Sequence, residues 1–272
     1  MTEYEFASAI AKRTREEGGH ALFVGGWVRD RILGLASEDI DLEVYGIAVD
    51  RLRELLAELG PVNAVGKNFT VYKVGPVHVS MPRTESKSGL GHRGFTVKGD
   101  PYLPIAEAAR RRDFTINAIA WDPLNDNYLD PYGGKNDLEQ RLLRVVDPHT
   151  FGDDSLRVLR ALQLVARFGL RVDETTKEIC RQTLLDDLPA ERVCGELEKL
   201  LLLSERPSRG FALAKELGVL DKLFPELKAL VGCEQELEWH PEGDVWVHTL
   251  QVIDQARSRI DDLDYPQQMA LM

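Results

Sequence analysis

The sequence predicts an α+β protein, in which a mixed sheet with flanking helices at residues 1–147 is followed by an all-helical remainder. Two observations support this prediction. Apolar or alternating runs of strand length occur before residue 147, at 21–24, 39–44, 62–65, 70–74 and 77–81. Helical periodicity continues from Val172 to Leu230, with helices expected at 174–185, 190–203, 208–217 and 221–224. The break at Asp147-Pro148 is the expected boundary between the two regions.

Turn residues and helical periodicity define the other elements of the N-terminal region. Residues 2–17 have the pattern of an amphipathic helix that leads into the first strand. A helix is expected after Gly25-Gly26, over 27–35, and another over 49–59, where leucines recur at helical spacing. The stretch 82–99 is dense in glycine and charge, which predicts a mobile surface loop.

Composition limits the class of protein. The 272 residues, 43% of them apolar, are enough for a sizeable core, and no apolar run has the length of a membrane span or a signal peptide. We therefore predict a cytoplasmic protein without a membrane partner. The net charge of −11 disfavours a nucleic-acid partner, but a local basic patch is sufficient for one. The three cysteines are widely spaced, which favours reduced thiols over disulfides or metal ligands.

Acidic and apolar residues alternate over 39–44, with the period of a strand. Asp39 and Asp41 are therefore expected to project from one face, with Ile40 and Leu42 in the core behind them. Two carboxylates close together repel each other unless a cation lies between them. Hard oxygen ligands suit Mg²⁺, with substrate phosphates completing its coordination. The alternative is a solvated strand edge, because Asp-x-Asp is a common pattern.

The glycine pair before this strand has an expected role in binding phosphate. Gly25-Gly26 follows an apolar strand, and it lets backbone N–H groups approach a phosphate closely at the start of a helix. Arg29 lies one turn into that helix, where its guanidinium could reach the same phosphates. Each feature alone has an ordinary explanation, as a turn or a surface ion pair. Their order along the chain favours a nucleotide site that contains Gly25, Gly26, Arg29 and the two aspartates.

The stretch Gly25-Gly26-Trp27-Val28-Arg29-Asp30, followed by Asp39-Ile40-Asp41, resembles the head-domain signature of class II tRNA nucleotidyltransferases (CCA-adding enzymes) and bacterial poly(A) polymerases. These enzymes belong to the DNA polymerase beta-like superfamily, so the resemblance implies a nucleotidyltransferase head with that fold. It also implies that Asp39 and Asp41 are catalytic metal ligands and that Asp30 belongs to the nucleotide site.

Three successive arginines begin a second motif, Arg110 to Ala118. A helix cannot direct all three side chains to solvent on one side, so at least one is expected to point inward. The alternative is a solvated basic patch. Arg111-Arg112-Asp113-Phe114-Thr115-Ile116-Asn117-Ala118 is similar to a family motif whose last arginine contacts the triphosphate, which the resemblance places at Arg112. Asn117 would then be structural or close to the sugar.

Asp154, Arg157 and Arg160 recur every three residues beside an apolar helical face. Their charges have an ordinary explanation as ion pairs on an exposed helix. The functional alternative is that Asp154 and Arg157 present an acceptor and fork donors to a base that carries an exocyclic amine, such as cytosine or adenine. The stretch resembles the family's neck motif, usually Glu-Asp-x-x-Arg, in which Asp and Arg select CTP or ATP without a template. Asp153 stands at its Glu position, and Arg157 and Arg160 match the nucleotide-contacting arginines.

The strand at 77–81 departs from the family pattern. The superfamily usually supplies a third carboxylate there, and the matching position in this chain is His78. A neutral histidine can bind a metal ion, but it adds no negative charge and prefers softer ions than Mg²⁺. The substitution therefore predicts a lowered activity or a variant site.

The segment Trp239 to Leu250 resembles the opening of an HD-type metal phosphohydrolase domain, which is fused to some tRNA nucleotidyltransferases. His240 and His248 are candidate metal ligands, although two histidines eight residues apart are weak evidence by themselves. The His-Asp pair of that family does not follow before Met272. We therefore expect three regions: a head at 1–147, a helical neck and RNA-binding region at 148–232, and a truncated start of an HD domain at 233–272, without hydrolase activity.

Together these motifs predict template-independent addition of CCA to tRNA 3′ ends from CTP and ATP, with Mg²⁺ as the cofactor. A specialised CC-adding or A-adding enzyme or a poly(A) polymerase shares all of these motifs, and the sequence does not separate them. Another class also stays open, a catalytically weakened RNA-binding or nucleotide-sensing module. His78 and the acidic net charge favour that module, and the intact aspartate pair opposes it.

Overall fold

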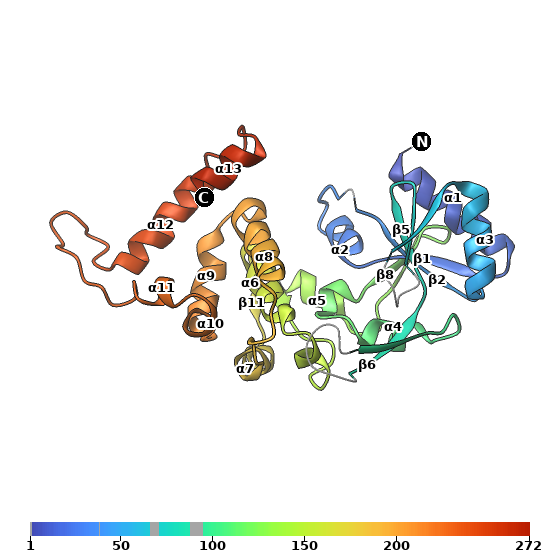
Figure 1. Cartoon of the computed structure of the whole chain (residues 1–272), viewed down its shortest axis with the longest axis horizontal. Helices are drawn as coiled ribbons and strands as arrows, with labels where there is room; N and C mark the ends of the chain where they lie inside the picture. Colours follow the sequence, from blue (N-terminus) through green and yellow to red (C-terminus); the bar gives the residue numbers. More distant parts are fainter. Residues whose placement is uncertain (1, 38, 66–70, 88–94) are drawn as a thin grey trace. The chain divides into compact units, whose positions relative to one another are not determined.

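The computed structural model describes residues 2–37, 39–65, 71–87 and 95–272 (Figure 1). The chain forms two compact units. The first consists of Met1–Gln140 and Arg144–Thr150, and the second of Arg141–Leu143 and Phe151–Met272. A mixed sheet with flanking helices makes up the first unit and helices make up most of the second, which confirms the predicted α+β class.

In the described residues of the first unit, seven strands form one sheet: β1 His20–Val24, β2 Asp41–Tyr45, β3 Val62–Val65, β4 Val71–Val74, β5 Val77–Ser80, β8 Ala120–Asp122 and β9 Asn127–Leu129. Their spatial order is β3-β4-β5-β2-β1-β8-β9. Strands β2 and β5 run parallel, whereas β1 is antiparallel to both β2 and β8, so the sheet is mixed. The five strands predicted from apolar and alternating runs are all present, with shifts of one or two residues at their ends.

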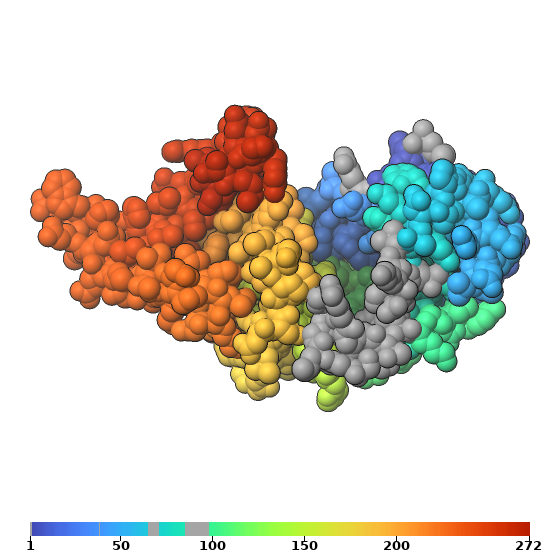
Figure 2. Space-filling model, in the orientation of Figure 1, coloured from blue at the N-terminus to red at the C-terminus, as the bar shows by residue number. Residues whose placement is uncertain are grey.

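The helices of the first unit are α1 Glu3–Glu16, α2 Gly26–Ile32, α3 Val49–Leu59, α4 Ile105–Arg110 and α5 Gly134–Glu139, with a 3-10 turn η1 at Thr115–Asn117. Helices α1 and α3 pack against each other and against strands of the sheet, and α3 lies at the surface of the unit (light blue in Figure 2). Aromatic side chains pack together on one face of the sheet. The ring centroid of Phe23 lies 4.7 Å from that of Trp27 and 5.3 Å from that of Trp121.

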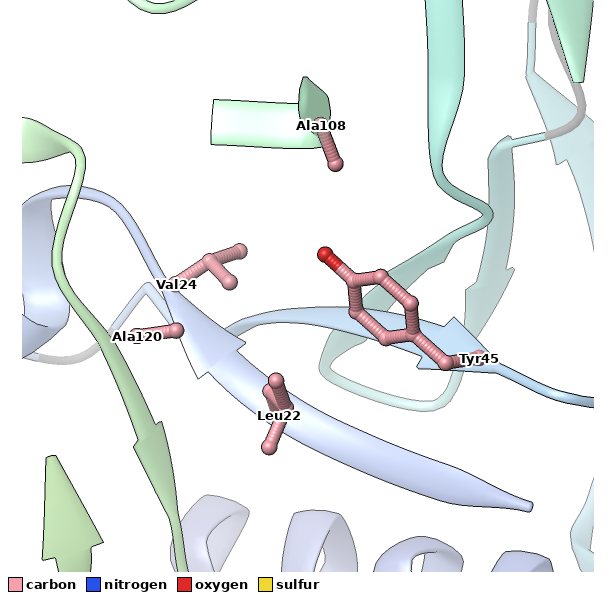
Figure 3. Packing of buried hydrophobic residues seen from close by; sticks show 5 residues of the cluster. All are labelled: Leu22, Val24, Tyr45, Ala108 and Ala120. Atoms are coloured by element: carbon pink, nitrogen blue, oxygen red, sulfur yellow. The ribbon is translucent and has the colours of Figure 1, made fainter. Parts of the chain in front are cut away.

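The opposite face of the sheet carries the polar side chains of β2. Cross-strand pairing places Leu22 opposite Glu43 and Val24 opposite Asp41, and directly paired residues share a face. Leu22 and Val24 pack there with Tyr45 and with α4 (Figure 3). Because side chains alternate along a strand, Asp41, Glu43 and Tyr45 all project from this face of β2.

The predicted loop at 82–99 is wrong for most of its length. Strand β6, Arg83–Lys87, pairs antiparallel with strand β7, Phe95–Gly99. The glycines that favoured a loop are concentrated between the two strands, in residues 88–94, which lie outside the described part of the chain. Dense glycine and charge in the sequence therefore did not exclude paired strands at both ends of the stretch.

The second unit is built around α6. Its helices are α6 Leu156–Phe168, α7 Glu174–Gln182, α8 Ala190–Leu203, α9 Pro207–Glu216, α10 Val219–Leu223, α11 Pro225–Lys228, α12 Val245–Arg257 and α13 Tyr265–Leu271, after a 3-10 turn η2 at Phe151–Asp153. The apolar face of α6 packs against α8 and α9. Helical periodicity did not predict the short parallel pair of β10, Leu142–Leu143, with β11, Arg171–Val172. Among the described residues, no helix has both the length and the apolar character of a bilayer span.

Candidate active site

Asp39 and Asp41 lie at the start of β2. Asp41 is the first residue of the strand, whereas Asp39 precedes it, so the strand begins two residues later than the alternation suggested. Both aspartates are exposed, while Ile40 and Leu42 are only 3% and 0% exposed. The predicted separation of acidic side chains from core side chains is therefore confirmed.

The electrostatic surroundings of Asp41 suit a cation. Desolvation raises the pKa of its carboxyl above the usual value, and the negative charge of Asp39 acts in the same direction, while Arg112 opposes it. The ionised form of Asp41 is therefore destabilised in the fold. A divalent cation between the two carboxylates would compensate for this, and their oxygen donors fit a hard ion.

Gly25 forms the turn between β1 and α2. Its φ of +76° lies in the left-handed region, which favours glycine. A β-carbon added at Gly25 would lie 3.3 Å from Nη1 of Arg112 and 4.0 Å from Oδ2 of Asp41. The turn, a guanidinium and a carboxylate therefore meet at one point, although they are far apart in sequence. The structure therefore brings Arg112, from the motif at 110–118, next to the turn and the aspartate of the motif at 25–41.

Arg29 is 5% exposed and lies against the glycine turn. Its Nε donates to Oδ1 of Asp30 at 2.8 Å, and its Nη1 donates to Oδ1 of Asn117 at 2.8 Å. A β-carbon added at Gly26 would lie 3.4 Å from Nη2 of Arg29, so the guanidinium supports the turn from inside the fold. Asp30 is its counter-ion. A direct contact of either residue with a nucleotide stays a prediction.

The three successive arginines differ in their surroundings. The side chain of Arg110 is 52% exposed, whereas those of Arg111 and Arg112 are 19% and 16% exposed. Nη2 of Arg111 donates to Oε1 of Glu43 at 2.9 Å, and Nη1 of Arg112 donates to the carbonyl oxygen of Asn117 at 3.4 Å. The prediction that at least one of them points inward is confirmed, and two do.

Glu43 lies in this site but was not predicted from the sequence. It is 2% exposed, and its Oε2 accepts a hydrogen bond from the hydroxyl of Tyr45 at 2.7 Å. Burial raises the pKa of the Glu43 carboxyl, but the charges of Arg112 and Arg111 outweigh burial and hold that pKa below its usual value. The alternation that revealed Asp41 continues through Glu43 and could have found it.

His78 lies opposite Asp41 in the parallel pair of β2 and β5. Nδ1 of His78 is 3.8 Å from Oδ1 of Asp41, and the His78 side chain is 42% exposed. The residue at the expected third-carboxylate position is therefore next to the candidate metal ligands. Its imidazole is placed to affect how a cation binds there.

The predicted base-selecting residues belong to the second unit, at the start of α6. Asp154 precedes this helix, Arg157 lies in its first turn and Arg160 follows. Arg192 of α8, which was not predicted, donates to both carboxylate oxygens of Asp154, at 3.1 Å each. Nη1 of Arg157 donates to the carbonyl oxygen of Phe151 at 3.4 Å. Arg192 therefore orients Asp154, whose remaining lone pairs can still accept from a base.

His240, Glu242 and His248 form a cluster before and within the first turn of α12. Their ligand atoms lie within 4.8 Å of one another. Oε1 of Glu242 is 3.4 Å from Nδ1 of His240 and also contacts Nδ1 of His248. The structure thus brings the two candidate histidines together and adds a carboxylate between them.

Known families match both units of the chain. Residues 21–144 match the family described as the poly A polymerase head domain, and residues 169–230 match the family described as the probable RNA and SrmB-binding site of polymerase A. The chain belongs to the tRNA nucleotidyltransferase and poly(A) polymerase family. Nucleotidyltransferases of this family generally depend on a divalent metal ion, which agrees with the paired aspartates.

Three similar proteins support membership of this nucleotidyltransferase family. A Multifunctional CCA protein from Stenotrophomonas maltophilia is 44% identical over 243 residues, which are 86% of this chain and 58% of that protein. Another, from Aromatoleum aromaticum, is 42% identical over 249 residues, covering 88% of this chain and 59% of that protein. A CCA-adding enzyme in its apo form I has a TM-score of 0.64 at 29% identity, covering 82% of this chain and 52% of that one. The chain therefore spans less than two thirds of each of these proteins.

Proposed function

We propose that this chain carries out template-independent nucleotidyl transfer and adds CCA to tRNA 3′ ends. The observation that supports this most strongly is the junction of Gly25, Asp41 and Arg112, which places a tight turn, a carboxylate and a guanidinium around one point. That combination suits a metal-bound triphosphate. The name shared by the relatives, Multifunctional CCA protein, agrees with the proposal.

The residues of the first unit have separate parts in this reaction. Asp39 and Asp41 would hold Mg²⁺, which when bound neutralises phosphate charge and lowers the pKa of the RNA 3′-hydroxyl. Arg112 donates to the triphosphate as a planar fork, and Arg29 fixes the turn whose backbone approaches the phosphates. The 3′-oxygen then attacks the α-phosphorus, and pyrophosphate leaves.

Base choice falls to the second unit in this proposal. Asp154 accepts from the exocyclic amine of cytosine or adenine, and Arg157 donates to the ring edge beside that amine. Arg160 contributes a further contact to the nucleotide. The substrates are therefore CTP, ATP and the 3′ end of a tRNA, in the cytoplasm, with residues 148–232 as the RNA-binding neck. Specialised CC-adding or A-adding enzymes and poly(A) polymerases are the alternatives.

The decisive experiment is incorporation of labelled CTP and ATP onto tRNA transcripts that end before, within and after CCA, with Mg²⁺ present. Growth that stops at CCA is expected. Continued addition of A would identify a poly(A) polymerase, and growth from CTP alone or ATP alone would identify a specialised enzyme. Mg²⁺-dependent ATP binding without any incorporation would replace the proposal with the nucleotide-sensing module.

The same assay tests the role of His78. A His78→Asp variant is expected to need about tenfold less Mg²⁺ for its half-maximal rate, because the number of charged oxygen ligands sets cation affinity. Asn63→Asp adds the same charge on β3, an edge strand that β4 separates from β5, and is expected to leave the requirement unchanged. An unchanged requirement in His78→Asp would show that this position does not contribute to the metal site.

We further propose that residues 233–272 are the start of an HD domain. The cluster of His240, Glu242 and His248 supports this assignment. Two imidazoles and one carboxylate suit Zn²⁺ and similar transition ions better than Mg²⁺. The donor set therefore favours a second metal site, chemically different from the aspartate pair in the first unit.

Calorimetric titration with Zn²⁺ tests this site. His248→Ala is expected to weaken Zn²⁺ binding at least about tenfold, because it removes one of three direct ligands. Removing a residue that only orients a metal ligand already weakens binding by about that much. His149→Ala removes a histidine outside the cluster and serves as the control. Equal affinities in wild type and His248→Ala would contradict the assignment.

A further inference from the structure

The carboxylate of Glu43 has no part in the reaction proposed so far, yet several side chains of the site converge on it. Its Oε1 accepts from Nη2 of Arg111 at 2.9 Å. Its Oε2 accepts from the hydroxyl of Tyr45 at 2.7 Å and lies 4.0 Å from Nη2 of Arg112. Glu43 is also 2% exposed. Both carboxylate oxygens are therefore already occupied by protein donors inside the fold.

This position does not suit a third metal-binding carboxylate. Asp41 pairs with Val24, next to the glycine turn, whereas Glu43 pairs with Leu22, farther along the strands. A step of two residues moves the α-carbon by about 7 Å along a strand. A metal ligand at Glu43 would also have to give up its hydrogen bond to Arg111. The carboxylate is placed to bind arginines rather than a cation beside Asp41.

Arg111 donates directly to this carboxylate, and Arg112 lies within ion-pair distance of it. The side chain of Arg112 is 16% exposed, and its Nη1 lies at the Gly25 turn, 3.3 Å from where a β-carbon would be. The donor contact from Nη1 to the carbonyl oxygen of Asn117 is long, at 3.4 Å. A guanidinium this enclosed needs a nearby negative charge, and a planar fork has to be held in one direction to bind phosphate.

We propose that Glu43 is a positioning residue that holds Arg111 and Arg112, so that Arg112 presents its guanidinium to the triphosphate at the Gly25 turn. Tyr45 completes the arrangement. Its side chain lies in the apolar cluster with Leu22 and Val24 (Figure 3), and its hydroxyl fixes the second oxygen of the carboxylate. The inference rests on the proposed nucleotidyl transfer and adds a residue through which triphosphate affinity is set.

Glu43→Gln tests the proposal because it keeps the size of the side chain and removes its charge. KM for CTP is expected to rise by about 10- to 100-fold, similar to the loss when a residue that orients a metal ligand is removed. The affinity for CMP, which lacks the β- and γ-phosphates, and the Mg²⁺ concentration for half-maximal rate are expected to stay the same. A raised Mg²⁺ requirement would instead make Glu43 a metal ligand and overturn the proposal.

A double-mutant cycle separates positioning from a general structural role. Arg112→Ala alone should weaken CTP binding, and adding Glu43→Gln should cause little further loss, because Glu43 acts through Arg112. Fully additive losses would overturn the proposal. In this cycle the Kd values for CTP and CMP are measured without turnover, so failure of this inference is distinguishable from failure of the catalytic proposal.

Tyr45→Phe provides a second variant if Glu43→Gln does not fold. It removes only the hydroxyl and keeps the ring in the apolar cluster, so a smaller rise in KM for CTP is expected. An unchanged KM in Tyr45→Phe would also overturn the positioning role. Asp50→Asn neutralises an exposed carboxylate on α3 and is the matched control for charge.

Discussion

Asp41→Asn is expected to reduce CMP and AMP incorporation by about 10³-fold or more, because a bound metal ion contributes several kcal/mol to transition-state stabilisation. The substitution keeps the shape of the side chain and removes the charge that would hold the ion together with Asp39. Single-turnover incorporation of CTP onto a tRNA transcript that lacks CCA measures the effect. Asp39→Asn is expected to cause a comparable loss, and Asp50→Asn none.

The same variant is expected to remain folded. Desolvation and the charge of Asp39 raise the pKa of Asp41 in the folded state, so folding favours the protonated form. The contribution of Asp41 to stability is therefore largest at low pH and is lost as the pH rises through its folded pKa. At neutral pH an uncharged Asn should not lower the thermal unfolding midpoint. Near-normal incorporation by a folded Asp41→Asn protein would refute the metal-binding role.

Asp154→Asn is expected to raise the ratio of UTP to CTP incorporation by about 10- to 100-fold, the discrimination that one paired base contact provides. Uracil has a carbonyl oxygen where cytosine has its exocyclic amine. The carboxylate of Asp154 can only accept hydrogen bonds, so it pairs with the amine of cytosine. The amide of an asparagine can also donate, so it can pair with the carbonyl oxygen of uracil. Incorporation rates with each triphosphate separately give the ratio.

A purely structural role of Asp154 would give a different result. Loss of its paired hydrogen bonds to Arg192 would lower CTP and UTP incorporation together and leave the ratio unchanged. Asp221→Asn, on α10 and ion-paired with Lys228, removes a comparable exposed charge in the same unit. We expect both the rates and the ratio of this control to match those of the wild type.

Local periodicity was sufficient to predict five strands of the main sheet, several of the longer helices and part of the site. The alternation from Asp39 to Leu42 separated exposed carboxylates from core residues, as the structure confirms. The helix at 190–203 was predicted with its observed ends. Such patterns predict elements because the residues on one buried face of a helix or strand recur at a fixed spacing along the chain. The pattern failed at 82–99, where turn residues in the middle obscured the pairing of β6 with β7.

Partners distant in sequence could not be predicted in this way. Glu43 is ion-paired with Arg111, and Arg192 donates two hydrogen bonds to Asp154. Both interactions join residues on different elements. Nothing in the local period of either element specifies the other. The resemblance assigned a role to Arg112, but its place beside the Gly25 turn follows from the packing of the sheet and the segment after α4.

By itself, the sequence determined the α+β class, the order of the motifs and the family, because these depend on local patterns and residue identity. The tertiary structure decided which charges meet. It enclosed Glu43 among two arginines and a tyrosine, left Asp39 and Asp41 exposed, and placed His78 beside them. The physical reason is that strand register and helix packing set distances between side chains, and those distances determine which carboxylate binds an arginine and which can bind a cation.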